Sequence, residues 1–172
     1  MRSPKDFSGK LEPMSVAFTK EEDYESVAAN LPDRPVSSHP NMVTPEGLAL
    51  IEAALAEARA AMTNAKSGGD VSADRTAMAR ATRDLRYWSS RRGSAQLVET
   101  GAPDGAVRFG EAVTIEREDG RRQTWRIVGE DEADPAKGSV SWISPLGQAL
   151  LGKRLGDEAV VAGQSVEIVA IG

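Results

Sequence analysis

Asp70 and Asp74 are the residues of this sequence best placed to do chemistry, because they lie at a break between two helical patterns. They are four residues apart, a spacing that puts both side chains on one face of a helix. Paired carboxylates can hold a divalent cation that activates water in phosphodiester hydrolysis. Asp70 also suits the N-cap of the second helix, and Asp74 suits its first turn, where the helix dipole favours negative charge. Both interpretations remain open at this stage.

Other residue types offer little material for a site. Cysteine is absent and His39 is the single histidine, which excludes disulfides and thiolate metal sites. The acidic run EDEAD (130–134) suggests a cation site, but it lacks the glycine and ligand spacing of an EF-hand loop. No nucleophile, base and orienting group come together, so we expect neither an independent enzyme nor a resident cofactor.

Residues 44–98 are predicted to form an antiparallel helical hairpin. Thr44 suits an N-cap and Pro45 the first helical position. Apolar residues then recur at spacings of three and four, which is typical of a seam between two helices. They are Leu48, Ile51, Leu55, Ala58, Met62 and Ala65, and, after the break at 67–69, Val71, Met78, Ala81, Leu85 and Trp88, with Asp74 on the same spacing. Two such runs of similar length predict a coiled-coil hairpin that ends at Gly93.

Residues 107–172 are predicted to form a compact antiparallel β domain with one short helix, so that the whole chain is α+β. Five short strands are expected, with a hairpin turn at Asp119-Gly120 and a helix over 144–153. The strands are AVTIE (112–116), QTWRIV (123–128), GSVSWIS (138–144), EAVVA (158–162) and SVEIVAI (165–171). Residues 99–106 form the expected linker.

Residues 1–43 contain five prolines, which prevent a long helix or strand, and we expect an extended or disordered arm. The formal net charge is -5, with an acidic C-terminal part and a mildly basic middle, which favours a protein partner over bare nucleic acid. We find no apolar run long enough to span a membrane and no signal-peptide pattern, so a cytoplasmic monomer is expected.

Three stretches of the chain resemble the GreA/GreB transcription elongation factors. TPEGLALIEAAL (44–55) is similar to the opening of the family's hairpin, and DLRYWSSRR (84–92) to the end of its returning helix. The third is the C-terminal stretch, where four segments follow in the family's order and approximate spacing. These segments are GEAVTIE (110–116), IVGEDEAD (127–134), SVSWISPLGQALLGK (139–153) and GDEAVV (156–161).

This resemblance implies an FKBP-like C-terminal domain that docks on the rim of the secondary channel of bacterial RNA polymerase, while the hairpin enters the channel. Contact with nucleic acid would then be indirect, through the transcription complex. The family docks through the loop that carries a Ser-Pro dipeptide, so Ser144 and Pro145 are the candidate contacts, with Trp142 and Ile143 beside them. Ser144 and Pro145 also suit the N-cap and first turn of the short helix.

The resemblance also bears on the hairpin tip, where cleavage factors of the family carry acidic residues that help polymerase to hold a second Mg²⁺. Gly69-Asp70 matches the start of that acidic tip, but Ala73 and Asp74 stand where the family has Glu and then Asn. Each arm is also about one heptad shorter than in the family, or about 10 Å of reach. Carboxylates that far back cannot coordinate a metal at roughly 2 Å.

The expected function is therefore a Gre-like factor that binds polymerase and regulates transcription without strong transcript cleavage. The first alternative is an active cleavage factor that rescues backtracked complexes through Asp70 and Asp74, stimulating the polymerase's own RNA cleavage. The second alternative is a regulator of a nucleotide-metabolising enzyme.

Overall fold

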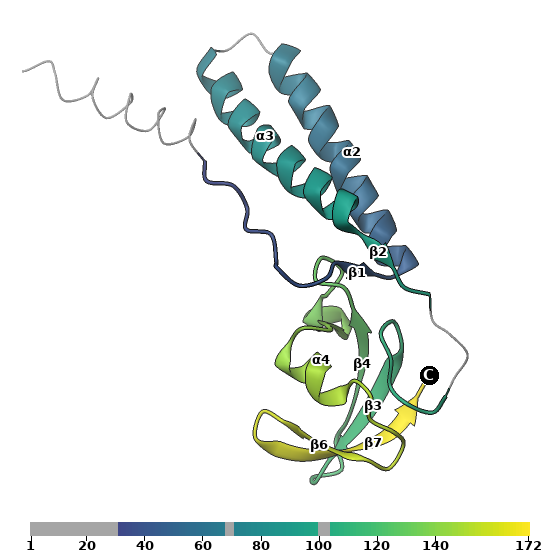
Figure 1. Ribbon diagram of the computed structural model, residues 1–172. Helices are drawn as coiled ribbons and strands as arrows, with labels where there is room; N and C mark the ends of the chain where they lie inside the picture. Colours follow the sequence, from purple (N-terminus) through teal and green to yellow (C-terminus); the bar gives the residue numbers. More distant parts are fainter. Residues whose placement is uncertain (1–30, 68–70, 100–103) are drawn as a thin grey trace, which may run out of the picture.

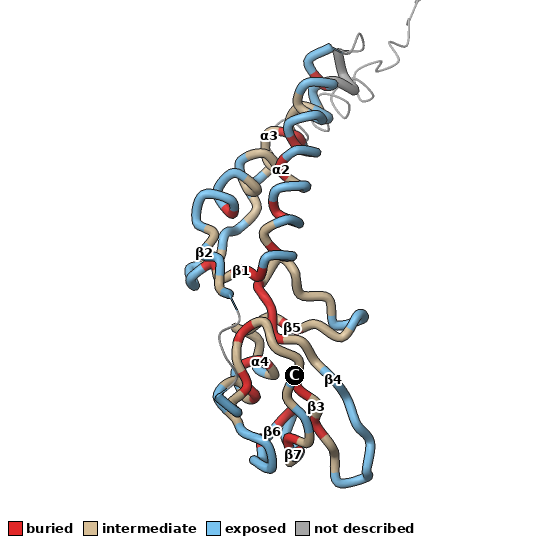
Figure 2. Tube along the Cα trace, turned by 90° about the vertical axis from the view of Figure 1, so that its right-hand side faces the viewer, coloured by how far each residue is buried: buried red, intermediate tan, exposed pale blue. Residues whose placement is uncertain are grey.

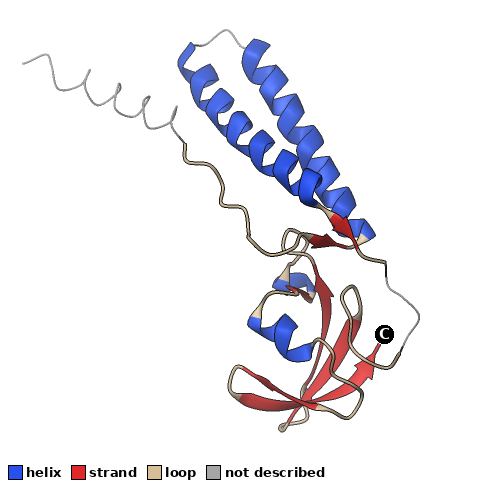
Figure 3. Cartoon of the chain, in the orientation of Figure 1, coloured by secondary structure: helices blue, strands red, loops and turns tan. Residues whose placement is uncertain are grey.

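The computed structural model describes residues 31–67, 71–99 and 104–172, which form a helical hairpin above a curled β domain (Figures 1 and 3). This arrangement confirms the predicted α+β class and the hairpin. The likeness to the FKBP fold stays a prediction. Of the predicted arm over 1–43, residues 1–30 lie outside this description, as do Asp70 at the hairpin tip and the side chains of 71–74.

The hairpin consists of α2 (Pro45–Ser67) and α3 (Val71–Ser94), which run side by side. Thr44 caps α2 as predicted, since its hydroxyl oxygen accepts a hydrogen bond of 2.9 Å from the Gly47 amide. The buried residues, coloured red in Figure 2, follow the predicted seam between the two helices. They are Ile51, Leu55, Ala58 and Ala65 on α2, with Ala81 on α3. With 23 and 24 residues, the arms are each about 35 Å long.

The β domain contains a five-stranded sheet with the strand order β5-β4-β3-β7-β6. The strands are β3 (Ala112–Arg117), β4 (Arg122–Val128), β5 (Ser139–Ser141), β6 (Glu158–Val161) and β7 (Gln164–Ile171). All neighbours are antiparallel except β4 and β5, which are parallel. The prediction of a wholly antiparallel sheet was therefore wrong at this edge, because the chain crosses over through a 3₁₀ turn, η1 (Pro135–Lys137), before β5.

Strand β5 is also shorter than the predicted run over 138–144. The Ser144 amide donates a 3.0 Å hydrogen bond to the Ser141 carbonyl, which turns the chain out of the sheet and into α4 (Pro145–Leu150). Helix α4 covers one face of the sheet, and its Leu150 is fully buried against Ile115, Ile127 and Ile168. This compact core fixes where the loop before α4 lies.

A short parallel pair, β1 (Met42–Val43) with β2 (Gln96–Leu97), joins the two ends of the hairpin. The Gln96 amide donates to the Asn41 carbonyl at 2.8 Å, and the Val98 amide donates to the Val43 carbonyl at 3.0 Å. This pairing was not predicted, since two residues are too few to show a strand pattern. Among the described residues, no helix is both long and apolar enough to cross a membrane.

Candidate functional site

The loop that carries Ser144 and Pro145 is a rigid helix start. The Ser144 hydroxyl oxygen accepts a 3.0 Å hydrogen bond from the Gly147 amide, and Pro145 occupies the first helical turn. Gly147 is required here, because a Cβ at this position would clash with the Ser141 carbonyl oxygen. The loop therefore presents its side chains in one fixed arrangement.

Exposure differs among the four candidate contact residues. Pro145 is exposed, whereas Trp142, Ile143 and Ser144 are half-buried. The Trp142 ring packs against the core of the β domain and meets His39 edge to face, with 6.2 Å between the ring centroids. Trp142 is therefore held by the β domain, and Pro145 is the one exposed residue of the four.

The hairpin tip is only partly described. Helix α3 begins at Val71, directly after Asp70, and Asp74 lies on its first turn. Asp70 and the side chain of Asp74 lie outside the described residues. Their role as a carboxylate pair thus stays a prediction.

A buried ion cluster joins the hairpin to the β domain. Arg91 near the end of α3 has a side chain only 2% exposed, and its Nε donates to the Asp131 carboxylate at 2.5 Å. The second carboxylate oxygen of Asp131 accepts a 2.6 Å hydrogen bond from the Tyr87 hydroxyl. Glu130 lies 3.6 Å from the Arg91 guanidinium. Charge-assisted bonds of this kind, shielded from water, hold the two parts in a fixed relation.

The start of α2 is fastened to the same loop. The Thr44 hydroxyl donates to the Glu132 carboxylate at 2.5 Å, while the same oxygen caps the helix. A Cβ at Gly47 would come within 2.5 Å of that carboxylate, so the Glu132 side chain would have to shift if Gly47 were replaced. Arg126 on β4 adds ion pairs of 3.1 Å to Glu46 and 3.7 Å to Glu132.

Residues 130–134, named here the acidic loop, are thus engaged in structure. Three of their carboxylates hold the two helices of the hairpin, and Asp134 caps η1 by accepting from the Ala136 amide at 3.1 Å. Within the described ranges, no cluster of three or more acidic or histidine side chains is arranged to hold a metal ion. Sequence reasoning missed Arg91, because an arginine within an Arg-Arg pair gives no local sign of burial.

The joint between the hairpin and the β domain changes the pKa of Tyr87. Burial, followed by the hydrogen bond to the Asp131 carboxylate, raises the pKa of Tyr87 to about 12. The phenol therefore stays neutral and keeps its proton for donation throughout the physiological range.

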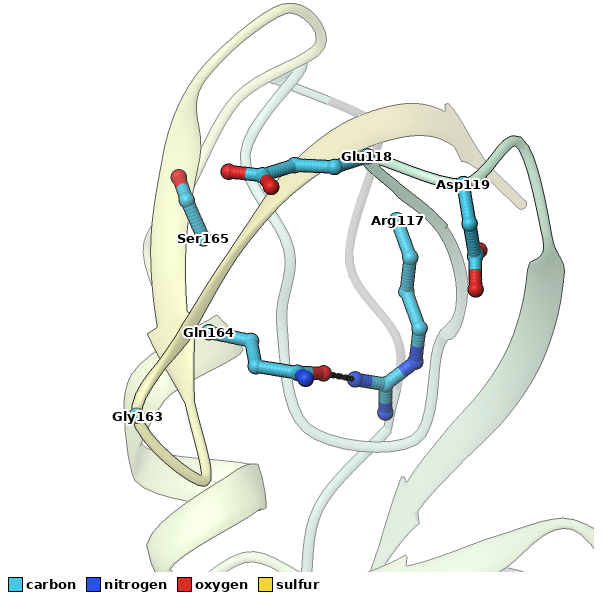
Figure 4. A pocket seen from close by; sticks show the side chains of 6 residues that line it. All are labelled: Arg117, Glu118, Asp119, Gly163, Gln164 and Ser165. Carbon is cyan, nitrogen blue, oxygen red and sulfur yellow. Dashed lines mark hydrogen bonds between the residues drawn. The ribbon is translucent and has the colours of Figure 1, made fainter.

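A separate hollow lies at the far end of the sheet, between the β3–β4 turn and the β6–β7 turn (Figure 4). Its volume is about 270 Å³, and its lining is polar. Arg117 points across it to Gln164, with 2.6 Å between Nη1 and the amide oxygen, and also donates to Gln123. The Arg117 guanidinium is therefore already bonded on several sides within this hollow.

Comparison with known proteins identifies the C-terminal part first. The family model described as "Transcription elongation factor, GreA/GreB, C-term" matches residues 102–172. The transcription elongation factor GreB of Neisseria meningitidis serogroup B is 36% identical over 109 residues, which cover 60% of this chain and 67% of that protein. The chain belongs to the GreA/GreB family.

Another GreA/GreB relative, the transcription elongation factor GreA of Desulfovibrio desulfuricans, is 43% identical over 97 residues, covering 55% of this chain and 59% of that protein. The chain spans between about half and two thirds of the length of such curated relatives. Among solved structures, the GreA factor homolog Gfh1 of Thermus thermophilus overlaps with 78% of this chain and 99% of its own, at a TM-score of 0.36 and 23% identity. A GreA/GreB factor from Nitrosomonas europaea overlaps with 78% of this chain and 98% of its own, at 0.37 and 18%. Overlaps at these scores add nothing to the family assignment.

Proposed function

We propose that this GreA/GreB family member binds bacterial core RNA polymerase at the rim of the secondary channel and regulates transcription there, without strong transcript cleavage. The observation that carries the proposal is the combination of a GreA/GreB C-terminal domain with a helical hairpin held to it by a buried ion cluster. The domain would dock through the loop at Ser144 and Pro145, and the hairpin would extend into the channel.

The rigidity of the candidate docking loop supports this role. Its backbone is fixed by the Ser144 cap and by the 2.9 Å bond from the Trp142 amide to the Val128 carbonyl. A loop that is already ordered loses little conformational entropy on binding. The exposed pyrrolidine ring of Pro145 and the half-buried Ile143 supply apolar contact area.

Weak cleavage activity is expected for two reasons, the length of the hairpin arms and the residue types at the hairpin tip. Helical arms of 23 and 24 residues extend the tip about 35 Å from the root. The family resemblance implies an arm about one heptad longer, with a Glu where this chain has Ala73. A carboxylate must lie roughly 2 Å from a metal to coordinate it, so a deficit of about 10 Å removes the interaction.

Binding of purified protein to bacterial core polymerase tests the docking surface. In a Pro145→Glu variant, glutamate suits the first turn of α4, so the fold is kept while a charge is added to the surface. We expect at least about a tenfold loss of affinity. The matched control is Val160→Glu, which places the same charge on an exposed position of β6 in the same domain and should bind as the wild type does. Equal affinity of both variants would refute the docking surface.

The alternative function, an active cleavage factor, is favoured by the position of α3, which starts immediately after Asp70 and carries Asp74 in its first turn. It requires that these carboxylates reach the polymerase metal. RNA cleavage in a stalled elongation complex distinguishes this function from regulation by binding alone.

A further inference from the structure

Residues 33–43, named here the strap, lead to the root of the hairpin (Figure 1). Side-chain and backbone contacts fasten the strap at two places. The lower place is the hairpin root itself. Asn41 is only 4% exposed, and its side-chain amide donates to the Arg91 carbonyl at 2.7 Å. A Cβ at Gly129 would lie 2.6 Å from the Met42 carbonyl oxygen, so the strap is in contact with both the hairpin and the β domain.

The upper place is a group of side chains on α3 that surrounds the guanidinium of Arg34. Its central carbon lies 3.7 Å from the centroid of the Tyr87 ring and 5.1 Å from that of the Trp88 ring. These two rings meet edge to face, with 4.9 Å between their centroids. The Asp84 carboxylate lies 3.6 Å from Arg34 Nη1. Two ring contacts and one carboxylate thus act on a single cation.

The spacing of these three residues explains why they form a site. Asp84, Tyr87 and Trp88 are at positions i, i+3 and i+4 of α3, which share one helix face. A flat, delocalised guanidinium can stack on an aromatic ring and form an ion pair with a carboxylate at the same time, which an ammonium does less well. The nearby pair of Arg86 and Asp33 is 67% and 64% exposed and contributes little.

We propose that Asp84, Tyr87 and Trp88 form a guanidinium-binding site that Arg34 fills within the same chain, and that the strap thereby fastens the hairpin to the β domain. Tyr87 takes part both in the binding of Arg34 and in the joint between the hairpin and the β domain. Its ring lies beneath Arg34, while its hydroxyl donates to Asp131 in the acidic loop. Release of Arg34 therefore removes one contact from the side chain that also holds the joint. This inference does not depend on polymerase binding.

Pairs of nitroxide spin labels test the proposal on the full chain. The natural sequence has no cysteine, so introduced cysteines take the label at known positions. The first pair, Val36→Cys with Asn64→Cys, joins exposed positions on the strap and on α2. The second pair, Asn64→Cys with Val160→Cys, reports the orientation of the hairpin relative to the β domain. Narrow distance distributions are expected for both pairs when Arg34 is present.

Arg34→Ala should broaden both distributions. Loss of two cation–π contacts corresponds to about a tenfold rise in the released fraction of the strap. Arg34→Lys should restore only part of the narrow distribution, because lysine keeps the charge but lacks the flat face. The matched control is Arg92→Ala, which removes an exposed arginine of α3 that pairs with Glu52 and should leave both distributions narrow.

Three results would overturn the proposal. An unchanged first distribution in Arg34→Ala would show that no guanidinium site anchors the strap. Full restoration by lysine would show that charge alone is recognised. Broadening of the first distribution without the second would show that the strap does not fasten the hairpin.

Discussion

Replacement of Arg91 by alanine is expected to be among the most destabilising single changes at the joint between the hairpin and the β domain. Its side chain is 2% exposed and that of Asp131 is 8% exposed, so water cannot replace the guanidinium once it is removed. Loss of one partner from a buried ion pair costs about 3–5 kcal/mol. Tyr87 still donates to Asp131, so we expect the lower end, about 3 kcal/mol.

Urea denaturation measures this loss, and the adjacent arginine supplies the control. Arg92 pairs with Glu52, but the two side chains are 46% and 51% exposed, so Arg92→Ala should cost no more than about 1 kcal/mol. Arg91→Lys should recover less than half of the alanine loss, since an ammonium cannot reproduce the planar guanidinium that donates to Asp131 and lies 3.6 Å from Glu130. Equal free energies of unfolding for Arg91→Ala and Arg92→Ala would refute the view that the buried cluster holds the joint.

Three further predictions concern a cap, a glycine and a phenol. Thr44→Ala should lower the free energy of unfolding by about 1–2 kcal/mol, and Thr44→Ser by less, because serine keeps the capping oxygen. Gly147→Ala should lower the free energy of unfolding, measured by thermal unfolding, by about 1–3 kcal/mol. The added methyl group would clash with the Ser141 carbonyl oxygen. Burial raises the pKa of Tyr87 to about 12 from 10.0, so the folded state holds its proton more tightly than the unfolded state. The stability that Tyr87 contributes should be constant below pH about 10 and should be lost between about 10 and 12, and Tyr87→Phe should remove this loss.

The hairpin and most of the strands could be predicted because their signals are local. Apolar residues at spacings of three and four specify a helix seam, and Ile51 and Leu55 are indeed buried in it. Alternation likewise predicted β3 and β7 to within a residue of their observed ends. Patterns of this kind depend only on neighbouring residues, which the sequence displays directly.

The contacts that join the parts could not be predicted, because they link residues far apart in the chain. Arg91 and Asp131 are separated by 40 positions, and Arg34 and Tyr87 by 53. An acidic run and an Arg-Arg pair each look like solvated surface when taken alone. Only the fold brings them together and removes the water between them. The direction of β5 was missed for a similar reason, since it depends on the crossover through η1.

Some features of the candidate site could likewise be predicted from the sequence, and others could not. The resemblance of the C-terminal stretch predicted the family, and the match over 102–172 confirms it. The cap at Ser144 was also predicted correctly from its type and from the following proline. The half-buried position of Trp142 was not, because a tryptophan beside a loop can equally face solvent or the core.

The most direct test of the proposed function is RNA cleavage by stalled elongation complexes of bacterial polymerase, measured in Mg²⁺ with the protein bound. Binding of the protein is checked in the same samples by co-purification, with Pro145→Glu as the variant that should not bind. We predict that the bound protein leaves the cleavage rate close to that of polymerase alone, and that Asp70→Ala changes nothing. Strong stimulation of cleavage that disappears in Asp70→Ala would contradict this account and assign the protein to the active cleavage factors.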